Sequence, residues 1–119
     1  MRISGITQWR PSEIHAIEQA IEYIHDHFIE NITAKDLSVM FSISLQKIYK
    51  GIKIKTGMTL RDYHQKIKID KAKLLLADKE IPVKDVFSQL GFKTQSHFGQ
   101  VFKENTGITP IEYRFSNVV

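Results

Sequence analysis

Apolar residues recur at helical spacing along most of this chain, and no segment shows the strict alternation that is typical of a strand. Pro11 and Ser12 precede the first apolar stripe. Its members are Ile14, Ile17, Ile21, Ile24 and Phe28. Because a proline suits the first turn of a helix, we predict a scaffold helix that begins here. The pattern as a whole predicts an all-α protein.

Two short helices joined by a tight turn are expected next. Thr33 and Ser44 are good N-cap residues, and each precedes a short run with helical periodicity. The first helix carries Leu37, and the turn falls at residues 41–43. For the second helix, the predicted inward residues are Leu45, Ile48 and Ile52. The sequence therefore predicts a helix, a tight turn and a second helix.

The longest uninterrupted helical pattern starts at Thr59 and runs to about Ala77. At about 1.5 Å per residue, it corresponds to a rod of about 28 Å. Another short helix is expected after it, then a turn at residues 91–93, and then a helix that Thr94 caps. Its predicted inward residues are Phe98 and Phe102. Pro110 is expected to begin the last helix.

A nine-residue phrase occurs twice, at residues 56–64 and 106–114. In each copy Thr-Gly ends a helix, because glycine tolerates the left-handed C-cap conformation, and the threonine two residues later caps the next helix. The chain therefore reads as two related helical modules. We predict an N-terminal extension or linker at 1–11, a first helix-turn-helix subdomain at 12–57, a linker helix at 58–78 and a second helix-turn-helix subdomain at 79–119.

Charge is distributed unevenly along the 119 residues. Residues 1–30 carry two basic and five acidic residues, whereas residues 46–73 carry nine basic and two acidic residues. The basic stretch favours a polyanionic partner, although a solvated lysine surface would give the same composition. No apolar run approaches the length of a membrane span, and cysteine is absent, so we expect a cytoplasmic protein with no membrane association.

The two helices that follow the turns carry polar residues of the kinds that read DNA. A helix fits the major groove, where glutamine pairs with adenine, lysine donates to guanine and tyrosine contacts a thymine methyl group. The candidate base-reading residues are Gln46, Tyr49, Lys50, Gln95, Ser96, Gly99 and Gln100. The candidate phosphate contacts are Ser44, Lys47, Lys53, Thr94, His97 and Lys103. Double-stranded DNA is the expected partner, with two reading helices in adjacent major grooves.

Catalytic and metal chemistry are not indicated. The five histidines lack a paired ligand at helical spacing, and no nucleophile elbow, phosphate loop or inward carboxylate pair is visible. We therefore expect no catalytic residues, no metal and no cofactor. The alternative to DNA binding is a helical protein-interaction module whose basic face docks an acidic partner.

Several short motifs resemble the signature of the AraC/XylS family of bacterial transcription regulators. They are Gly91-Phe92, Ser96-His97-Phe98, Val101-Phe102-Lys103, residues 106–110 and Tyr113-Arg114. The long helix is similar to that of the family at Tyr63, Lys71-Ala72 and Leu75-Leu76. The resemblance covers about residues 12–116.

The resemblance implies a seven-helix domain with two helix-turn-helix subdomains on a long linker helix, as in MarA-like members, acting at promoters with RNA polymerase. Ser42 stands where the family usually has glycine, Gly51 where it has a large apolar residue, and Gln100 where an arginine often reads bases. A glycine inside a helix costs about 1 kcal/mol relative to alanine. No sensing domain fits in this length, so we expect either a stand-alone regulator or the C-terminal piece of a larger one, with a sensor or receiver domain elsewhere.

Overall fold

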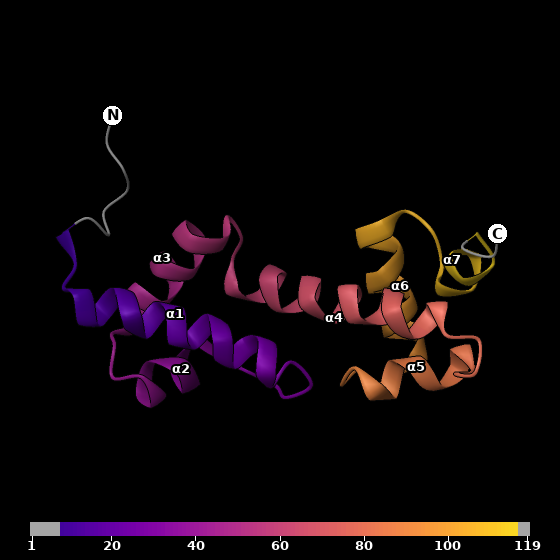
Figure 1. The fold of residues 1–119 in the computed structure, drawn as a ribbon, viewed down its shortest axis with the longest axis horizontal. Helices are drawn as coiled ribbons and strands as arrows, with labels where there is room; N and C mark the ends of the chain where they lie inside the picture. The colour runs from indigo at the N-terminus through magenta and orange to yellow at the C-terminus, as the bar shows by residue number, and fades with distance from the viewer. Residues whose placement is uncertain (1–7, 117–119) are drawn as a thin grey trace. The chain divides into compact units, whose positions relative to one another are not determined.

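The computed structural model describes residues 8–116, which form seven α-helices and no strand. The helices are α1 (Pro11–Asp26), α2 (Ala34–Met40), α3 (Leu45–Thr56), α4 (Leu60–Ala77), α5 (Val83–Gln89), α6 (Gln95–Thr106) and α7 (Pro110–Ser116). The chain divides into two compact units, residues 1–64 and 65–119, and α4 runs from the first into the second (Figure 1). The predicted all-α fold is confirmed. Residues 1–7 of the predicted N-terminal extension and the last three residues, 117–119, lie outside the described range.

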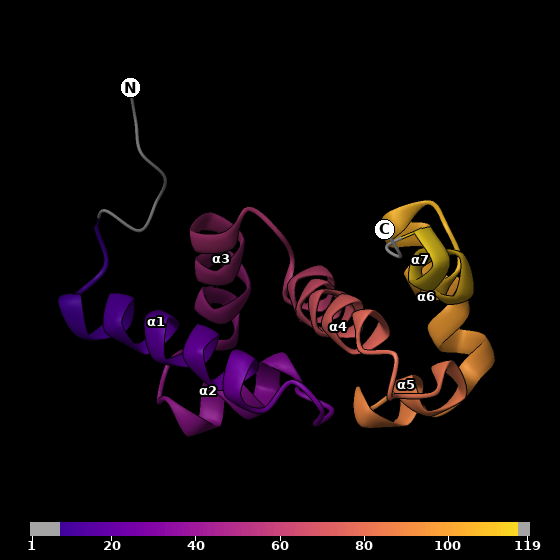
Figure 2. The same cartoon turned by 45° about the vertical axis from the view of Figure 1, so that its right-hand side comes forward.

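The first unit is built around α1. Its core consists of side chains from three helices, each at most 1% exposed. They are Ile17, Ile24, Leu37, Ile48 and Ile52. Figure 2 shows α3 crossing α1 rather than running along it. One face of α3 is therefore buried against the scaffold while the opposite face is left to solvent.

The second unit repeats this plan with larger side chains. Its largest fully buried side chains come from α4, α5 and α6 and from the turn after α5. They are Leu76, Val86, Leu90, Phe98 and Phe102. Tyr113 of α7 packs edge-on against Phe102, with 5.6 Å between ring centroids. The expectation that Phe98 and Phe102 point inward is confirmed.

The repeated phrase makes the same hydrogen bonds in both copies. Thr56 Oγ1 donates to the carbonyl oxygen of Ile52 at 2.7 Å, and Thr106 Oγ1 donates to that of Phe102 at 2.8 Å. The next residues, Gly57 and Gly107, have φ values of 78° and 87°. This left-handed conformation ends each helix and is what glycine accommodates without strain.

A second correspondence links the last residues of the two phrases. His64 Nε2 lies 2.7 Å from the carbonyl oxygen of Phe28, just after α1 ends, and Arg114 Nε donates to that of Leu76 at 2.7 Å, near the end of α4. Each contact satisfies a carbonyl group at or beyond a helix C-terminus, where no intrahelical donor is available. Within its own unit, α4 therefore serves the second module as α1 serves the first.

The structure corrects three expectations about individual residues. Leu45 was predicted to face inward, but it is 43% exposed, because it begins α3, beyond the part of the helix that its neighbours cover. Phe28 was placed on the stripe of the first helix, but α1 ends at Asp26. Gly51 looked like a defect in α3, yet a Cβ atom there would lie 2.5 Å from Ile17 Cδ1. This glycine is what permits α1 and α3 to cross closely.

Candidate nucleic-acid interface

The first turn is held by backbone and side-chain hydrogen bonds between α2 and α3. The amide of Ile43 donates to the carbonyl oxygen of Ser38 at 3.1 Å, and the Ser38 hydroxyl donates to that of Ile43. Between them Ser42 has a φ of 53°, a left-handed conformation that few residues other than glycine adopt. The equivalent residue of the second turn, Gly91, has a φ of 84°. Both turns therefore require the same backbone geometry.

Ser44 begins the candidate reading helix α3 as its N-cap. Its hydroxyl oxygen accepts a hydrogen bond from the amide of Lys47 at 3.2 Å, which confirms the predicted cap. With Ile48 and Ile52 fully buried, the opposite face of α3 is exposed. That face carries Gln46, Tyr49, Lys50 and Lys53. The structure therefore places these four candidate residues on one solvent-facing surface.

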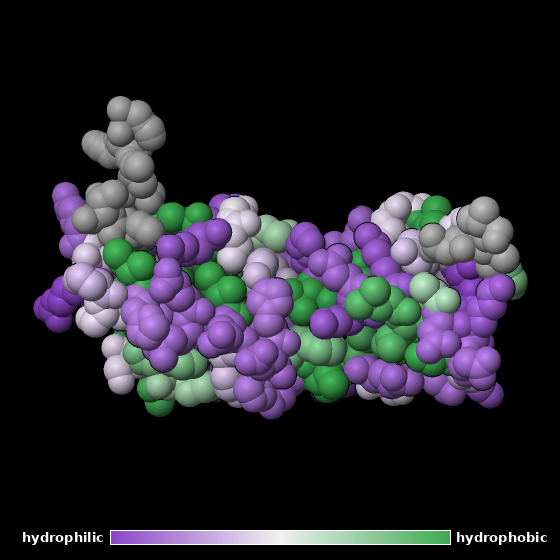
Figure 3. All heavy atoms as spheres, in the orientation of Figure 1, coloured by the Kyte–Doolittle hydropathy of each residue, from purple (hydrophilic) through white to green (hydrophobic). Residues whose placement is uncertain are grey.

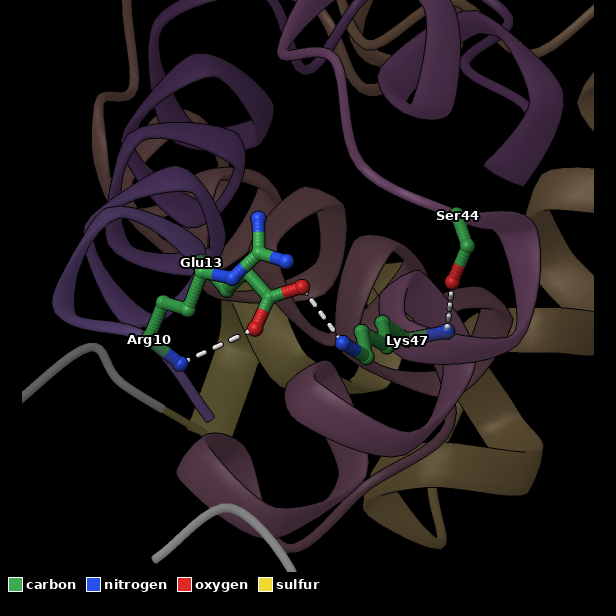
Figure 4. Close-up of polar contacts among 4 residues, drawn as sticks. All are labelled: Arg10, Glu13, Ser44 and Lys47. Atoms are coloured by element: carbon green, nitrogen blue, oxygen red, sulfur yellow. Dashed lines mark hydrogen bonds and ion pairs between the residues drawn. The ribbon is translucent and has the colours of Figure 1, made fainter. Parts of the chain in front are cut away.

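Lys47 is the exception among the candidate residues of α3. Its ammonium group is hydrogen-bonded and ion-paired to Glu13 Oε2 of α1 (Figure 4). The same nitrogen lies 5.4 Å from the centroid of the Trp9 ring. The other carboxylate oxygen of Glu13 accepts from the amide of Arg10 at 2.9 Å. The hydrogen bond from Lys47, followed by that from Arg10, lowers the pKa of Glu13. The charge of Lys47 is therefore already neutralised within the first unit.

The second candidate reading helix, α6, is positioned in the same way. Thr94 is its N-cap and accepts from the amide of His97 at 3.1 Å, as predicted. Phe98, Val101 and Phe102 are buried. The exposed candidates are Gln95, Ser96, His97, Gln100 and Lys103. Gly99 lies among them, half-buried, and a Cβ atom there would meet nothing within 4 Å.

The two exposed faces differ in charge. On α3 the face carries Lys50 and Lys53, and in the part of the chain that the structure describes neither side chain has an acidic partner. On α6 the cation is Lys103, and the Gln100 amide nitrogen lies 3.4 Å from a carboxylate oxygen of Glu104. The exposed face of α3 is therefore the more positively charged of the two, whereas that of α6 presents mostly neutral hydrogen-bonding groups.

Sequence reasoning missed the acidic partners of the basic stretch. Besides Lys47, Lys55 pairs with Glu18 at 3.4 Å and Lys66 pairs with Asp70 at 2.8 Å. The pair within α4 has helical i,i+4 spacing, which the sequence shows directly. The pairs between α1 and α3 join residues more than 30 positions apart, so no local pattern reveals them.

Lys68 also departs from the simple picture of a solvated lysine surface. It is half-buried, and its ammonium nitrogen lies 5.0 Å from the centroid of the Phe92 ring in the second turn. Burial lowers the pKa of Lys68. This lysine covers the aromatic residue of the turn, a cation–π contact within the second unit.

Two features of other protein classes are absent from residues 8–116. No three His, Cys, Asp or Glu side chains there come together as a metal site requires. No helix in this range combines the length and apolar character needed to cross a bilayer. Apolar side chains do reach the surface in both units, among polar ones (Figure 3). Two of the large ones, Leu45 and Tyr49, lie on α3, and the others lie in the loop after α1 and on α2, α4 and α7.

The sequence and the fold both have relatives among known proteins. A family model described as "Helix-turn-helix domain" matches residues 37–116. The HTH-type transcriptional activator RhaS of Klebsiella pneumoniae is 25% identical over 114 residues, covering 96% of this chain and 41% of the relative. The chain thus spans about two fifths of that protein's length.

Two solved structures share the fold over most of their length. The C-terminal domain of AraT, a response regulator from Geobacillus stearothermophilus, is 25% identical with a TM-score of 0.81, covering 100% of this chain and 91% of that one. The C-terminal domain of the two-component response regulator yesN from Fusobacterium nucleatum is 29% identical with a TM-score of 0.75, covering 84% and 98%. Both are C-terminal domains of longer regulators.

Proposed function

Because the chain belongs to the AraC/XylS family of helix-turn-helix domains, we propose that α3 and α6 are its two reading helices and that each enters a major groove of one duplex. Membership of this family makes the chain a sequence-specific DNA-binding domain of a transcription regulator and not an enzyme. The observation that carries the assignment of the helices is the duplicated turn, after which each helix is capped, buried on one side and polar on the other.

Base reading is assigned to the residues that share the exposed faces. Gln46 and Lys50 of α3 suit adenine and guanine, respectively, and Tyr49, which is 56% exposed, offers a ring to a thymine methyl group. On α6 the readers are Gln95, Ser96, Gly99 and Gln100. Gly99 contributes an open surface over which a base edge can approach the backbone. The two faces differ, so the preferred site should not be a palindrome.

Phosphate contacts are assigned to the ends and flanks of the reading helices. Ser44 and Thr94 lie at helix N-termini, where amide groups and the helix dipole favour an anion. Lys53, His97 and Lys103 are exposed and would contact the backbone on either side of the groove. Lys47, the remaining candidate, is ion-paired with Glu13.

The length of α4 supports binding to one duplex by both helices. Its 18 residues span about 27 Å. Major grooves on one side of a duplex recur about every 34 Å. A single chain could therefore engage two half-sites one helical turn apart, as a dimer of simpler helix-turn-helix proteins does.

The rest of the protein's activity is inferred from its relatives. The chain corresponds to 41% of the RhaS activator, and two of its structural neighbours are C-terminal domains of response regulators. We propose that a sensor or receiver domain accompanies this one in the full-length regulator and that the regulator acts with RNA polymerase at promoters. Such a protein works where bacterial DNA lies, in the cytoplasm.

Selection from a pool of random duplexes, followed by sequencing, tests this function most directly. We expect an enriched, non-palindromic site with two conserved blocks separated by about one helical turn of DNA. Binding should weaken as salt rises. Lys53→Ala, which removes a proposed phosphate contact, should make the plot of log affinity against log salt less steep by about 0.9, the loss of one phosphate neutralised.

Lys79→Ala is the matched control, because Lys79 is an exposed lysine on the loop between α4 and α5 and belongs to neither reading helix. It should leave the slope unchanged. Failure to enrich any sequence would reject the function and favour a protein-docking module. A single conserved block would reject the use of both helices.

A further inference from the structure

Trp9 and Glu13, just before and within the first turn of α1, make contact with the reading helix α3. One carboxylate oxygen of Glu13 accepts a hydrogen bond from the ammonium group of Lys47, and the other accepts one from the amide of Arg10 (Figure 4). Its side chain is 21% exposed and that of Lys47 is 35% exposed, so solvent only partly screens the pair. The carboxylate is thus fixed by two elements and does not swing freely.

Trp9 also contacts Lys47 and the same side of α3. Its ring lies 5.4 Å from the Lys47 nitrogen, and Trp9 Cζ3 would lie 3.2 Å from a Cβ atom at Gly51. Lys47 and Gly51 are four residues apart on α3 and therefore lie on one side of that helix. The indole rests against that side, with the ammonium group between it and Glu13.

Lys47 occupies the position on α3 from which a lysine would ordinarily reach a phosphate. It lies in the first helical turn, three residues after the Ser44 cap, where a reading helix approaches the DNA. Instead its charge is compensated by Glu13, whereas Lys50 and Lys53 have no acidic partner within residues 8–116. A phosphate would have to displace a carboxylate that other contacts hold in place.

We propose that Glu13 is a specificity-determining residue: by holding Lys47, it removes one cation from the sequence-independent attraction to phosphate and leaves discrimination to the base-reading face. This inference rests on the proposed function. Binding to random DNA arises almost entirely from phosphate contacts, while binding to the preferred site also gains from base contacts. Pairing Lys47 with Glu13 therefore weakens binding to random DNA and leaves the contacts with the bases of the preferred site in place.

The test uses this chain and two duplexes, the selected site and a scrambled sequence, titrated over a range of potassium chloride concentrations. Glu13→Gln keeps the length of the side chain but removes its charge, so Lys47 is released. Affinity for the scrambled duplex should rise about three- to tenfold at low salt, and the salt slope should steepen by about 0.9. In the otherwise unchanged protein, Lys47→Gln should leave the salt slope as it is. Added to Glu13→Gln, it should abolish the gain in affinity for the scrambled duplex.

Glu18→Gln is the matched control. Glu18 also lies on α1 and also pairs with a lysine of α3, but Lys55 belongs to the last turn of that helix, far from its cap. The control removes the same charge and should change the slope much less than Glu13→Gln. Equal steepening by both variants would mean that net charge alone is responsible and would overturn the proposal.

The remaining outcomes also decide the matter. Thermal melting would reveal whether Glu13→Gln unfolds the chain. If it does, Lys47→Gln in the otherwise unchanged protein still tests the proposal. An unchanged salt slope supports it, and a slope reduced by about 0.9 overturns it. If the parent binds DNA and Lys53→Ala lowers the slope but Glu13→Gln does not raise it, only this inference fails. If the parent binds no duplex, the proposed function itself fails.

Discussion

Ser42 is the one described residue other than glycine with a positive φ, and it lies in the turn that orients the first reading helix. A left-handed conformation costs an L-residue about 1–2 kcal/mol, because its Cβ atom approaches the following carbonyl oxygen. Gly91 takes the same place in the second turn without that cost. The geometry of the turn is therefore set by the packing of the helices on either side and not by the residue within it.

Replacing Ser42 by glycine should stabilise the domain. Removing about 1–2 kcal/mol of strain is partly offset by the greater backbone entropy that glycine loses on folding, about 0.5–1 kcal/mol, so we expect a gain of about 0.5–1 kcal/mol. Urea unfolding followed by circular dichroism would measure it. As a control, Ser88→Gly in α5 places the same change at an exposed helical residue and should destabilise. A loss of stability for Ser42→Gly would contradict the strain argument.

Single residues also show where reasoning from sequence succeeds. Ser44 and Thr94 were predicted as caps, and both accept the expected amide hydrogen bond, since a cap depends only on residues three positions away. The hydrogen bond between Lys47 and Glu13 joins residues 34 positions apart, and no signal in the sequence predicts it. Whether the predicted DNA-contacting residues make their contacts stays a prediction.

The crossing of α1 and α3 determines how the first reading helix is presented. Gly51 lies at the contact, where a Cβ atom would come 2.5 and 2.6 Å from Ile17 Cδ1 and Cγ1, distances that real Cβ atoms do not show. Ile17 is itself 1% exposed and has little room to move. The sequence gives the period of α3 but not how closely its neighbour approaches, and so a glycine that looked unfavourable is in fact required.

Gly51→Ala should destabilise the domain even though alanine is the better helix former. Overpacking of this kind costs about 1–3 kcal/mol, which exceeds the gain in helix propensity of about 1 kcal/mol. Gly99→Ala is the matched comparison, because it makes the same change inside a helix of equal length with nothing within 4 Å of the new atom. That variant should be stabilised by about 1 kcal/mol. Equal effects of the two substitutions on urea unfolding would refute the close crossing.

Helix boundaries were more predictable than side-chain burial. The starts at Pro11 and Pro110 and the ends before Gly57 and Gly107 follow from local chemistry, and the structure confirms them. The prediction that Leu45 faces inward was wrong, because a stripe of apolar residues shows which residues share a side of a helix but not how far along the helix a neighbouring element extends. Periodicity therefore predicts which residues share the inward face of a helix, and tertiary packing determines which of them are buried.

Each unit has a hydrogen-bonded carboxylate in the first turn of one of its helices. In the first unit Glu13 accepts from Lys47 and from the amide of Arg10, and in the second Glu112 accepts from the amide of Thr109 at 2.8 Å. These hydrogen bonds lower the pKa of both side chains below the usual value of 4.5. Because both groups are accessible to solvent, each contribution should be small and sensitive to salt.

Acid should therefore weaken both units in the same pH range. A carboxyl group whose pKa is lower in the folded state stabilises that state at pH values above 4.5, and the stabilisation is lost as the pH falls through the lowered pKa. The melting temperature should be level from pH 7 to about 5 and decline below about 4.5.

Glu112→Gln, which keeps the reach of the side chain but cannot ionise, should have a lower melting temperature at pH 7, and that temperature should decline less steeply with acid. A variant that declines as steeply as the parent would show that other groups cause the loss. Glu104→Gln provides the comparison, because Glu104 is exposed and lies in the last turn of α6 and not at the start of a helix; its melting temperature should stay close to that of the parent at every pH.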